Sequence, residues 1–409
     1  MKSTLLLSAL LGICLFGACS SEEPIQSYSQ TITPINDNRI SPEEAIASAQ
    51  HCVEMIAPTQ TRTSKERQVK SLEVVGRSNI LTRSGEKLDT LMYIINFEDE
   101  AGFAIMSADR RALPVYAISD EGRFEITDNT NEGVKLLLKG MEDDIIDKMS
   151  NDFYPTKWPD PWEMYMKTYV GPNLSPFQRA LGPNAETSKY CVNTAGQPAL
   201  TNRVAIVIEQ YISSALFTNR FFRWDKIIDE NDIDEVAKVV KRIGDSMHLQ
   251  YKDLNNVAEY TEIEFDNAFN DMEFVGMPYE PGPFSENEDL IQYILNDQSD
   301  YFGGVMVYAP KSEISDESLW MIDGYAGCLR PVGNNGMIEY EIFQYLYHCV
   351  WGDGGTCNGY YCIGTSGNCI GEPSFIDKTD MIPYPSGFKA NARGAIIFLP
   401  VHLSMYTGI

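Results

Sequence analysis

The sequence predicts an α+β fold, because stretches with helical periodicity alternate with β-rich stretches. Two apolar, β-rich runs at residues 92–97 and 103–108 flank an acidic break that contains Gly102, which is typical of a β-hairpin. Residues 129–150 place their apolar side chains on one face, which predicts an amphipathic helix. The length of 409 residues predicts more than one domain.

The first helix is predicted to begin after residue 41. Ser41 can cap it, Pro42 suits its first turn, and Glu44 follows the serine at the spacing of a capping box. Apolar residues then recur at helical spacing as far as Ile56. The polar and basic residues 62–77 predict a loop or an edge strand, and the hairpin is followed by a further predicted strand at residues 114–117.

The N-terminus has the parts of a secretory signal. Lys2 provides a positive start, residues 5–16 form a short apolar run, and two small residues precede Cys19. A cysteine at this point resembles a bacterial lipobox, in which it is lipidated and becomes the mature N-terminus. We expect a signal peptide at residues 1–18 and a lipidated Cys19 that begins a tether over residues 19–39. Ordinary signal cleavage with an incidental cysteine is the alternative.

The predicted location follows from this N-terminus. The acidic run after Cys19 resembles the surface-export signal of Bacteroidetes lipoproteins, so we expect an outer-membrane or cell-surface lipoprotein of a Gram-negative bacterium. No other segment has the apolar length of about 20 residues that a membrane-spanning helix needs. The formal net charge of -26 argues against a nucleic-acid partner, because nucleic-acid binding requires clustered Lys and Arg.

Four cysteines lie close together near the C-terminus. For an exported chain their spacing predicts one or two disulfides or free buried thiols: Cys349, Cys357, Cys362 and Cys369. No pair has the Cys-x-x-Cys spacing of structural zinc sites, so we predict no metal. The glycine-rich residues 352–355 lack the lysine and helix of a phosphate loop, and we predict a turn there and no cofactor. The acidic pair Asp143 and Asp144 is interpreted as a solvated helix face.

A family resemblance covers roughly residues 40–150. The strand at residues 92–97, the Gly-Phe-Ala-Ile-Met-Ser-Ala-Asp-Arg-Arg stretch at 102–111 and Pro-Val-Tyr-Ala at 114–117 together resemble the proregion of streptopain-type cysteine peptidases. The same module occurs as a free-standing inhibitor of such enzymes. Residues 151–176 are rich in proline and aromatics and are interpreted as an ordered connector, because disordered linkers are usually poor in aromatics.

The remainder, residues 177–409, resembles the papain-like catalytic domain of the same family. An apolar strand ends in Asp-Gly-Tyr at residues 320–325, and residues 348–361 contain Trp-Gly-Asp-Gly-Gly and Asn-Gly-Tyr-Tyr. Residues 222–244 are a weaker match. The resemblance implies a papain-like fold with a helical subdomain and a sheet subdomain, preceded by the small α+β proregion-like domain.

The resemblance also implies where the reactive residues should stand. Such an enzyme needs a thiolate at a helix N-terminus and a histidine that carries its proton. Alignment of the helix that contains Val204, Ala205 and Gln210 places Arg203 at the nucleophile position, and one-residue slips give Asn202 or Val204. The position of the histidine falls on Ser318.

Two supporting groups are also missing. The asparagine that orients the histidine is replaced by Val350, and residues 189–192 contain no glutamine for an oxyanion hole. Four replacements together predict a domain that keeps the fold without the reaction. Cys191 and His348 are candidates for a relocated pair; the alternative is that Cys191 is a buried or bridged thiol and that His348 packs structurally.

Three functions follow as hypotheses. The first is a surface-anchored pseudopeptidase that binds an extended peptide or protein in its cleft by main-chain pairing, with Arg203 favouring acidic ligands. A cleft that the proregion blocks in solution would exclude this hypothesis. The second is an inhibitor of related cysteine peptidases that acts through residues 40–150. The third is an active cysteine-type endopeptidase that uses Cys191 and His348.

Overall fold

The computed structural model describes most of the chain between residues 38 and 363 and three short strands beyond it. Contacts group Asn38–Ile409 into one compact unit, separate from Met1–Asp37. The predicted signal peptide, Cys19 and nearly all of the tether lie outside the described residues, as do Cys369 and residues 151–163 of the connector. The described residues are 38–56, 67–76, 90–128, 130–150, 164–214, 221–261, 263, 265–272, 277–278, 291–292, 295, 304–309, 317–332, 339–363, 382–383, 389–390 and 396–399.

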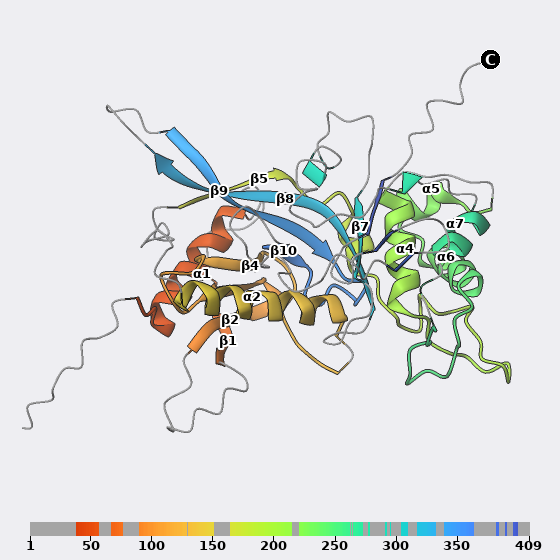
Figure 1. Ribbon diagram of the computed structural model, residues 1–409. Helices are drawn as coiled ribbons and strands as arrows, with labels where there is room; N and C mark the ends of the chain where they lie inside the picture. Colours follow the sequence, from red (N-terminus) through yellow and green to blue (C-terminus); the bar gives the residue numbers. More distant parts are fainter. Residues whose placement is uncertain are drawn as a thin grey trace, which may run out of the picture. The chain divides into compact units, whose positions relative to one another are not determined.

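The proregion-like part contains the predicted helices and hairpin (Figure 1). Ser41 accepts a hydrogen bond from the backbone N–H of Glu44 at 3.2 Å, which confirms the predicted helix start. Gly102 in the hairpin turn has a φ of 104°, and a Cβ there would lie 2.0 Å from the carbonyl oxygen of Ser119. The elements are α1 (Pro42–Ile56), β1 (Val69–Gly76), β2 (Thr90–Phe97), η1 (Glu98–Glu100), β3 (Phe103–Ser107), β4 (Val115–Ser119) and α2 (Glu132–Ser150).

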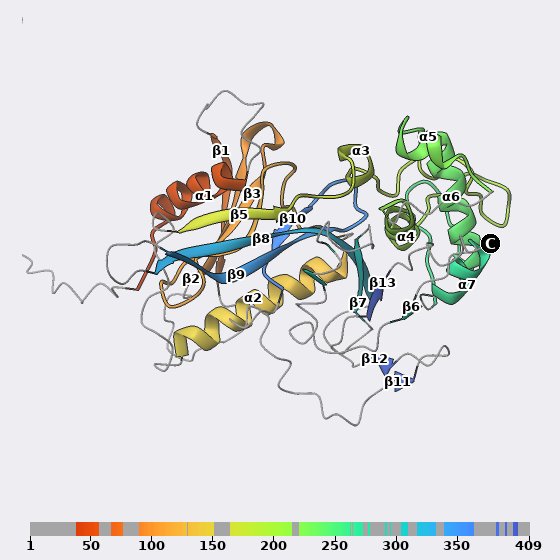
Figure 2. The same ribbon diagram turned by 90° about the horizontal axis from the view of Figure 1, so that it is seen from above.

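The remainder of the described chain combines a group of helices with long antiparallel strands. Figure 2 shows α4 to α7 gathered together and β8 running beside β9. The helices are α3 (Pro176–Arg179), α4 (Arg203–Ser214), α5 (Trp224–Ile228), α6 (Ile233–Ser246) and α7 (Phe265–Asp271). The strands are β5 (Tyr165–Val170), β6 (Met277–Pro278), β7 (Val305–Ala309), β8 (Ser318–Val332), β9 (Glu339–Val350), β10 (Gly359–Tyr361), β11 (Ile382–Pro383), β12 (Lys389–Ala390) and β13 (Ile396–Leu399).

One 11-stranded sheet runs through both parts in the order β1-β2-β3-β4-β10-β9-β8-β7-β13-β6, and β5 pairs with β8. The short strand β10 joins the two parts, because it pairs with β4 on one side and β9 on the other. Tyr360 lies opposite Ile118 of β4 and opposite His348 of β9. Helices and antiparallel strands therefore form one mixed structure, which confirms the predicted α+β class.

Strands β7 and β8 separate two hydrophobic cores. Side chains on a strand alternate between its faces. Val307 and Trp320 accordingly pack with the proregion-like part, whereas Met306 and Leu319 pack with α4 and α6. Among the described residues, no helix has the length and apolar character required to span a membrane.

Candidate functional site

Arg203 is the first residue of α4, at the helix end that favours negative charge. The preceding residue, Asn202, is buried and accepts a hydrogen bond from the backbone N–H of Val204 at 2.9 Å, which caps the helix. Arg203 Nε lies 3.4 Å from Asp353 Oδ1, and both side chains are mostly buried. A guanidinium is no nucleophile, so the first turn of α4 presents a charge pair in place of a thiolate.

Ser318 begins β8 and is buried against the proregion-like part. Its hydroxyl donates to the side-chain oxygen of Asn131 and accepts from the backbone N–H of Gly133 at 2.8 Å. Asn131 and Gly133 lie at the start of α2. The residue at the histidine position therefore binds the chain's own proregion-like segment.

Asn131 also donates hydrogen bonds to Leu319, Trp351 and Asp353. Its amide nitrogen donates to the carbonyl oxygens of Leu319 at 3.0 Å and Trp351 at 3.1 Å. Its backbone N–H donates to Asp353 Oδ2 at 3.1 Å. Asp353 thus connects Asn131 with Arg203, and the positions predicted for the nucleophile and the histidine lie in one hydrogen-bonded network.

Gly133 leaves no free space beside Ser318. A Cβ on Gly133 would lie 2.9 Å from the hydroxyl oxygen of Ser318 and 2.9 Å from the rings of Trp320 and Trp351. The two tryptophan rings contact each other, with their centroids 5.5 Å apart. The chain itself therefore closes this part of the site.

The positions predicted for the two supporting groups carry no catalytic side chain. Val350 lies opposite Met321 and is fully buried in the core around α4. Residues 189–192, where the oxyanion glutamine was expected, do not line the pocket beside Arg203. The residues upstream of Arg203 that line this pocket are 182–184 and Leu200, and none is a glutamine.

Cys191 and His348 have separate partners. Burial raises the pKa of the Cys191 thiol to about 11, and this thiol lies beside Tyr251 and Thr201. A thiol with this pKa is protonated at neutral pH and is a poor nucleophile. His348 Nδ1 lies 2.5 Å from Asp323 Oδ1.

Asp323, from the Asp-Gly-Tyr stretch, also contacts the segment before α3. Its second carboxylate oxygen accepts the backbone N–H of Leu174 at 3.1 Å, and its backbone oxygen accepts that of Asn173 at 3.0 Å. The ring of His348 packs edge-on against Tyr360, with 5.0 Å between centroids. His348 and Asp323 thereby hold the segment that leads to α3 against the sheet.

The structure does not contain the two disulfides that were one of the options for the four clustered cysteines. Cys349 and Cys357 are free and buried, so the option of two disulfides within the cluster is wrong. Cys362 is disulfide-bonded, and its partner lies outside the described residues, because the other five described cysteines are free. Within the described part of the chain, no three His, Cys, Asp or Glu residues are grouped to hold a metal.

The interpretation of the acidic pair on α2 is wrong for one member. Asp144 is buried, accepts a hydrogen bond from the Tyr116 hydroxyl at 2.6 Å, and lies 3.6 Å from the buried ammonium of Lys148. Burial raises the pKa of Asp144 to about 6. Only Asp143 is exposed, and it pairs with Lys139.

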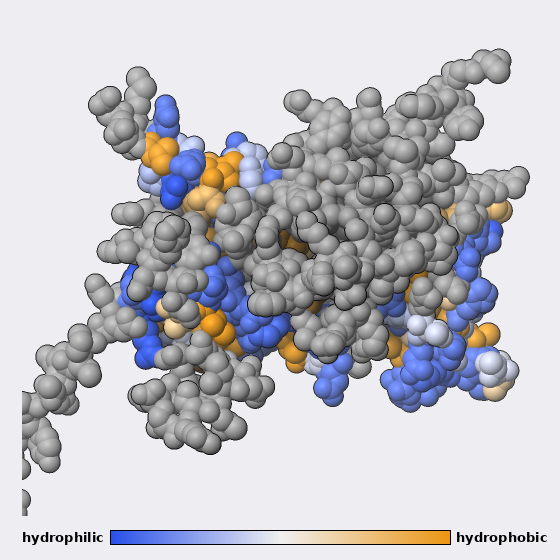
Figure 3. Space-filling view, in the orientation of Figure 1, coloured by the Kyte–Doolittle hydropathy of each residue, from blue (hydrophilic) through white to orange (hydrophobic). Residues whose placement is uncertain are grey.

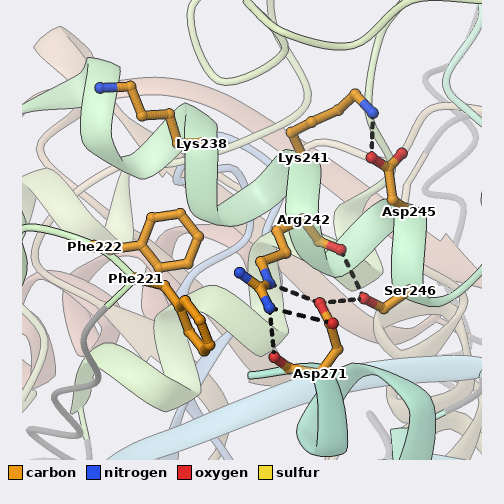
Figure 4. Close-up of a pocket in the computed structure, with 8 residues that line it drawn as sticks. All are labelled: Phe221, Phe222, Lys238, Lys241, Arg242, Asp245, Ser246 and Asp271. Atoms are coloured by element: carbon orange, nitrogen blue, oxygen red, sulfur yellow. Dashed lines mark hydrogen bonds and ion pairs between the residues drawn. The ribbon is translucent and has the colours of Figure 1, made fainter. Parts of the chain in front are cut away.

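Of two pockets in the described chain, one is lined by Arg203 and Asp353 and the other lies away from the predicted site residues. One, of about 550 Å³, lies against α6 and includes none of the predicted site residues (Figure 4). There Arg242 Nε lies 2.7 Å from Asp271 Oδ2 and the guanidinium stacks over Phe221 at 3.9 Å, while Lys241 pairs with Asp245. The other, of about 460 Å³, is lined by Arg203 and Asp353.

Comparison with known proteins identifies one part of the chain. Residues 37–145 match the model of the Spi protease inhibitor family, which confirms the predicted proregion or inhibitor module. No curated protein matches the chain. A solved fragment of prointerpain A from Prevotella intermedia is 16% identical, with a TM-score of 0.48, and covers 80% of this chain and 98% of its own. Active interpain A cysteine protease of the same organism is 15% identical, with a TM-score of 0.33, and covers 58% and 97%.

Proposed function

We propose that this protein is a catalytically inactive relative of streptopain-type cysteine peptidases that binds a peptide or protein segment without cleaving it. The observation that carries the proposal is the network at the expected reactive centre. Arg203 stands at the start of α4 and pairs with Asp353, while Ser318 is hydrogen-bonded to Asn131. Among the described residues of this network, neither a cysteine nor a histidine is present to attack a peptide bond.

The geometry restricts where a ligand binds. Asn131 and Gly133 of the proregion-like part fill the space beside Ser318, so the proposal does not keep the extended peptide across the whole cleft that the first hypothesis expected. Among the described residues, the lining of the pocket of about 460 Å³ beside Arg203 includes none from the proregion-like part. We therefore place the bound segment in this pocket, with the proregion-like part remaining in position.

Inhibition of a related cysteine peptidase is the second candidate, and the match of residues 37–145 to the Spi protease inhibitor family favours it. To act in trans, this module would have to leave the sheet in which β4 pairs with β10. Titration of an active streptopain-type peptidase with the purified protein tests the idea, and an unchanged rate removes it.

Anchoring at the cell surface is a further part of the proposal, and it rests on the lipobox-like sequence around Cys19. We expect metabolic labelling with a lipid precursor to label the wild-type protein and not Cys19→Ala. Equal labelling of both proteins would remove Cys19 as the lipidation site, and a wild-type protein without label would remove the lipid anchor.

The principal test is hydrolysis of casein and of a peptide library by residues 20–409 under reducing conditions, before and after limited proteolysis. We expect no thiol-dependent turnover in either form. Turnover that Cys191→Ala abolishes would establish the third function, an endopeptidase with a relocated nucleophile.

A further inference from the structure

Two buried thiols lie on the two sides of the boundary between the proregion-like part and the remainder of the chain. Cys52 belongs to α1 and Cys328 to β8, and each has an exposed fraction of 0%. Both side chains lie in the same hydrophobic core, and both thiols are free. A bond between these two sulfurs would join the two parts of the protein covalently.

The β5–β8 strand pair brings α1 close to Cys328. Figures 1 and 2 both show α1 beside β5, and the two elements are in contact. The backbone N–H of Met166 on β5 donates to the sulfur of Met55 at 3.4 Å, and Met55 lies about one turn after Cys52 on α1. Met166 in turn lies directly opposite Cys328. These contacts place the two cysteines on neighbouring segments.

The sheet face at Cys328 meets the proregion-like part. Cys328 lies opposite Gln344 of β9, and directly opposite residues place their side chains on one face of a sheet. The buried side chain of Gln344 donates to the carbonyl oxygen of Val115 on β4 at 2.7 Å. Burial raises the pKa of the Cys328 thiol well above its usual value, and a charge on the Cys52 sulfur raises it further. Such an effect arises between groups that lie close together.

We propose that Cys52 and Cys328 form a disulfide when the protein folds in an oxidising compartment, and that this bond fixes the proregion-like part to the sheet. One S–S bond replaces two S–H bonds. The oxidant is a second disulfide, carried by a thiol–disulfide oxidoreductase or by glutathione, which takes up the two electrons and the two protons and leaves as two thiols. The proposal rests on the export proposed for this chain, since exported proteins meet such oxidants.

Burial determines when the bond forms. It raises the pKa of the Cys52 thiol to about 12, so almost no thiolate exists near neutral pH in the folded protein. Disulfide exchange requires a thiolate and access to it. Hydrophilic side chains make up much of the coloured surface in Figure 3, and both thiols lie beneath the surface. The bond therefore forms before α1 has packed, and protein that is folded in reductant keeps both thiols.

The bond also has a consequence for the two candidate functions. A disulfide between residues 52 and 328 closes a long loop, and the restriction of the unfolded chain grows with loop length. The module that matches the Spi protease inhibitor family could then not leave the sheet to act in trans. Oxidised protein would keep this module in place even after the connector is cut.

Oxidative refolding tests the proposal and supplies its own oxidant, so the result does not depend on export. Residues 20–409, with a specific protease site placed within residues 151–163, are reduced in guanidinium and refolded with reduced and oxidised glutathione. Free thiols are then blocked with iodoacetamide and the site is cut. We expect denaturing electrophoresis without reductant to show the two fragments linked, and reductant to separate them. Cys52 is the only cysteine in the sequence of the N-terminal fragment, so any disulfide link must include it.

Variants identify the second cysteine. Cys328→Ser should lose the linked species, whereas Cys349→Ser, at another free and buried thiol of the same core, should keep it. Wild-type fragments that separate without reductant overturn the proposal, and so does a link that persists in Cys328→Ser. If Cys328→Ser fails to fold, mass spectrometry of digested wild-type protein decides, because the proposal requires the Cys52 peptide to be joined to the Cys328 peptide.

Discussion

The Ser318 hydroxyl donates a hydrogen bond to the side-chain oxygen of Asn131, which lies far upstream in the proregion-like part. The two residues begin β8 and precede α2, respectively. Together with the bonds from Asn131 to Leu319 and Trp351, this contact fills the space around the position that the resemblance predicts for a histidine. The stability of the whole protein should therefore depend on it.

Asn131→Ala should destabilise the protein by about 2 kcal/mol or more, because it leaves several buried polar groups without partners. Denaturant unfolding of residues 20–409 measures the change. Lys139→Ala, on the exposed face of the same helix, is the control and should change the free energy of unfolding by less than about 0.5 kcal/mol. Equal stability of Asn131→Ala and the wild type would show that the contact is not needed to hold α2.

Cys191 should resist alkylation in the native protein. Burial raises the pKa of its thiol to about 11, so little thiolate exists at pH 7.5. We expect iodoacetamide to modify Cys191 at least tenfold faster in guanidinium than in buffer, as followed by mass spectrometry. The buried Cys52 of α1 serves as an internal reference, since burial raises its pKa to about 12. Rapid native labelling of Cys191 alone would instead favour the relocated nucleophile.

Glu209 should make the protein less stable as pH rises. Burial in α4 raises the pKa of Glu209 from 4.5 to about 7, so the folded state binds a proton that the unfolded state has lost between these pH values. The stabilisation of the folded state by the protonated Glu209 is complete below pH 4.5. About 3 kcal/mol of it is lost as the pH rises from 4.5 through about 7. Glu209→Gln should make the melting temperature depend less on pH between pH 5 and 8. Glu186→Gln, a change at an exposed residue, is the control and should leave the pH dependence unchanged.

Asp144 should also make the protein less stable as the pH rises, but over a lower pH range than Glu209. Burial raises its pKa from 3.8 to about 6, so its contribution is lost as pH rises from about 4 through 6. The residual slope of Glu209→Gln should therefore lie below pH 6. A full slope between pH 6 and 8 in that variant would assign the effect to another group.

The proregion-like part should remain bound after the connector is cut. Strand β10 pairs with both β4 and β9, and the side chain of Gln344 donates to the carbonyl oxygen of Val115 at 2.7 Å. A specific protease site placed within residues 151–163 should yield two fragments that co-elute in gel filtration without denaturant. Separation of the N-terminal fragment under these conditions would support release in trans and the inhibitor hypothesis.

Local features of the sequence predicted local features of the fold. The alternation of apolar runs around Gly102 gave the β2–β3 hairpin, and Ser41 marked the start of α1. The pairing of β4 with β10 joins residues far apart in the chain, and only three residues of β10 take part, so periodicity carries no signal for it. Asp144 was assigned to solvent because its partner Tyr116 lies on another element.

The site was predicted only in part. The resemblance assigned Arg203 and Ser318 to the two reactive positions, and the structure links them through Asp353 and Asn131, which was not predicted. The role of Asn131 was missed, because an asparagine before a helix reads simply as a cap. The pocket wall at residues 182–184 was missed because Gly182 packs against Gly354, a contact between distant segments.

The crowding around Gly133 bears on which side chain position 318 can hold. A Cβ at Gly133 would lie 2.9 Å from the Ser318 hydroxyl oxygen and from both tryptophan rings, so this position accepts only glycine unless its neighbours move. The backbone N–H of Gly133 lies 2.8 Å from the Ser318 hydroxyl oxygen, so a larger side chain at position 318 would need a shift of α2, and Ser318→His should cost stability. Under the proposed function, a histidine at this position would therefore need a second change in α2, and one substitution alone would not supply it.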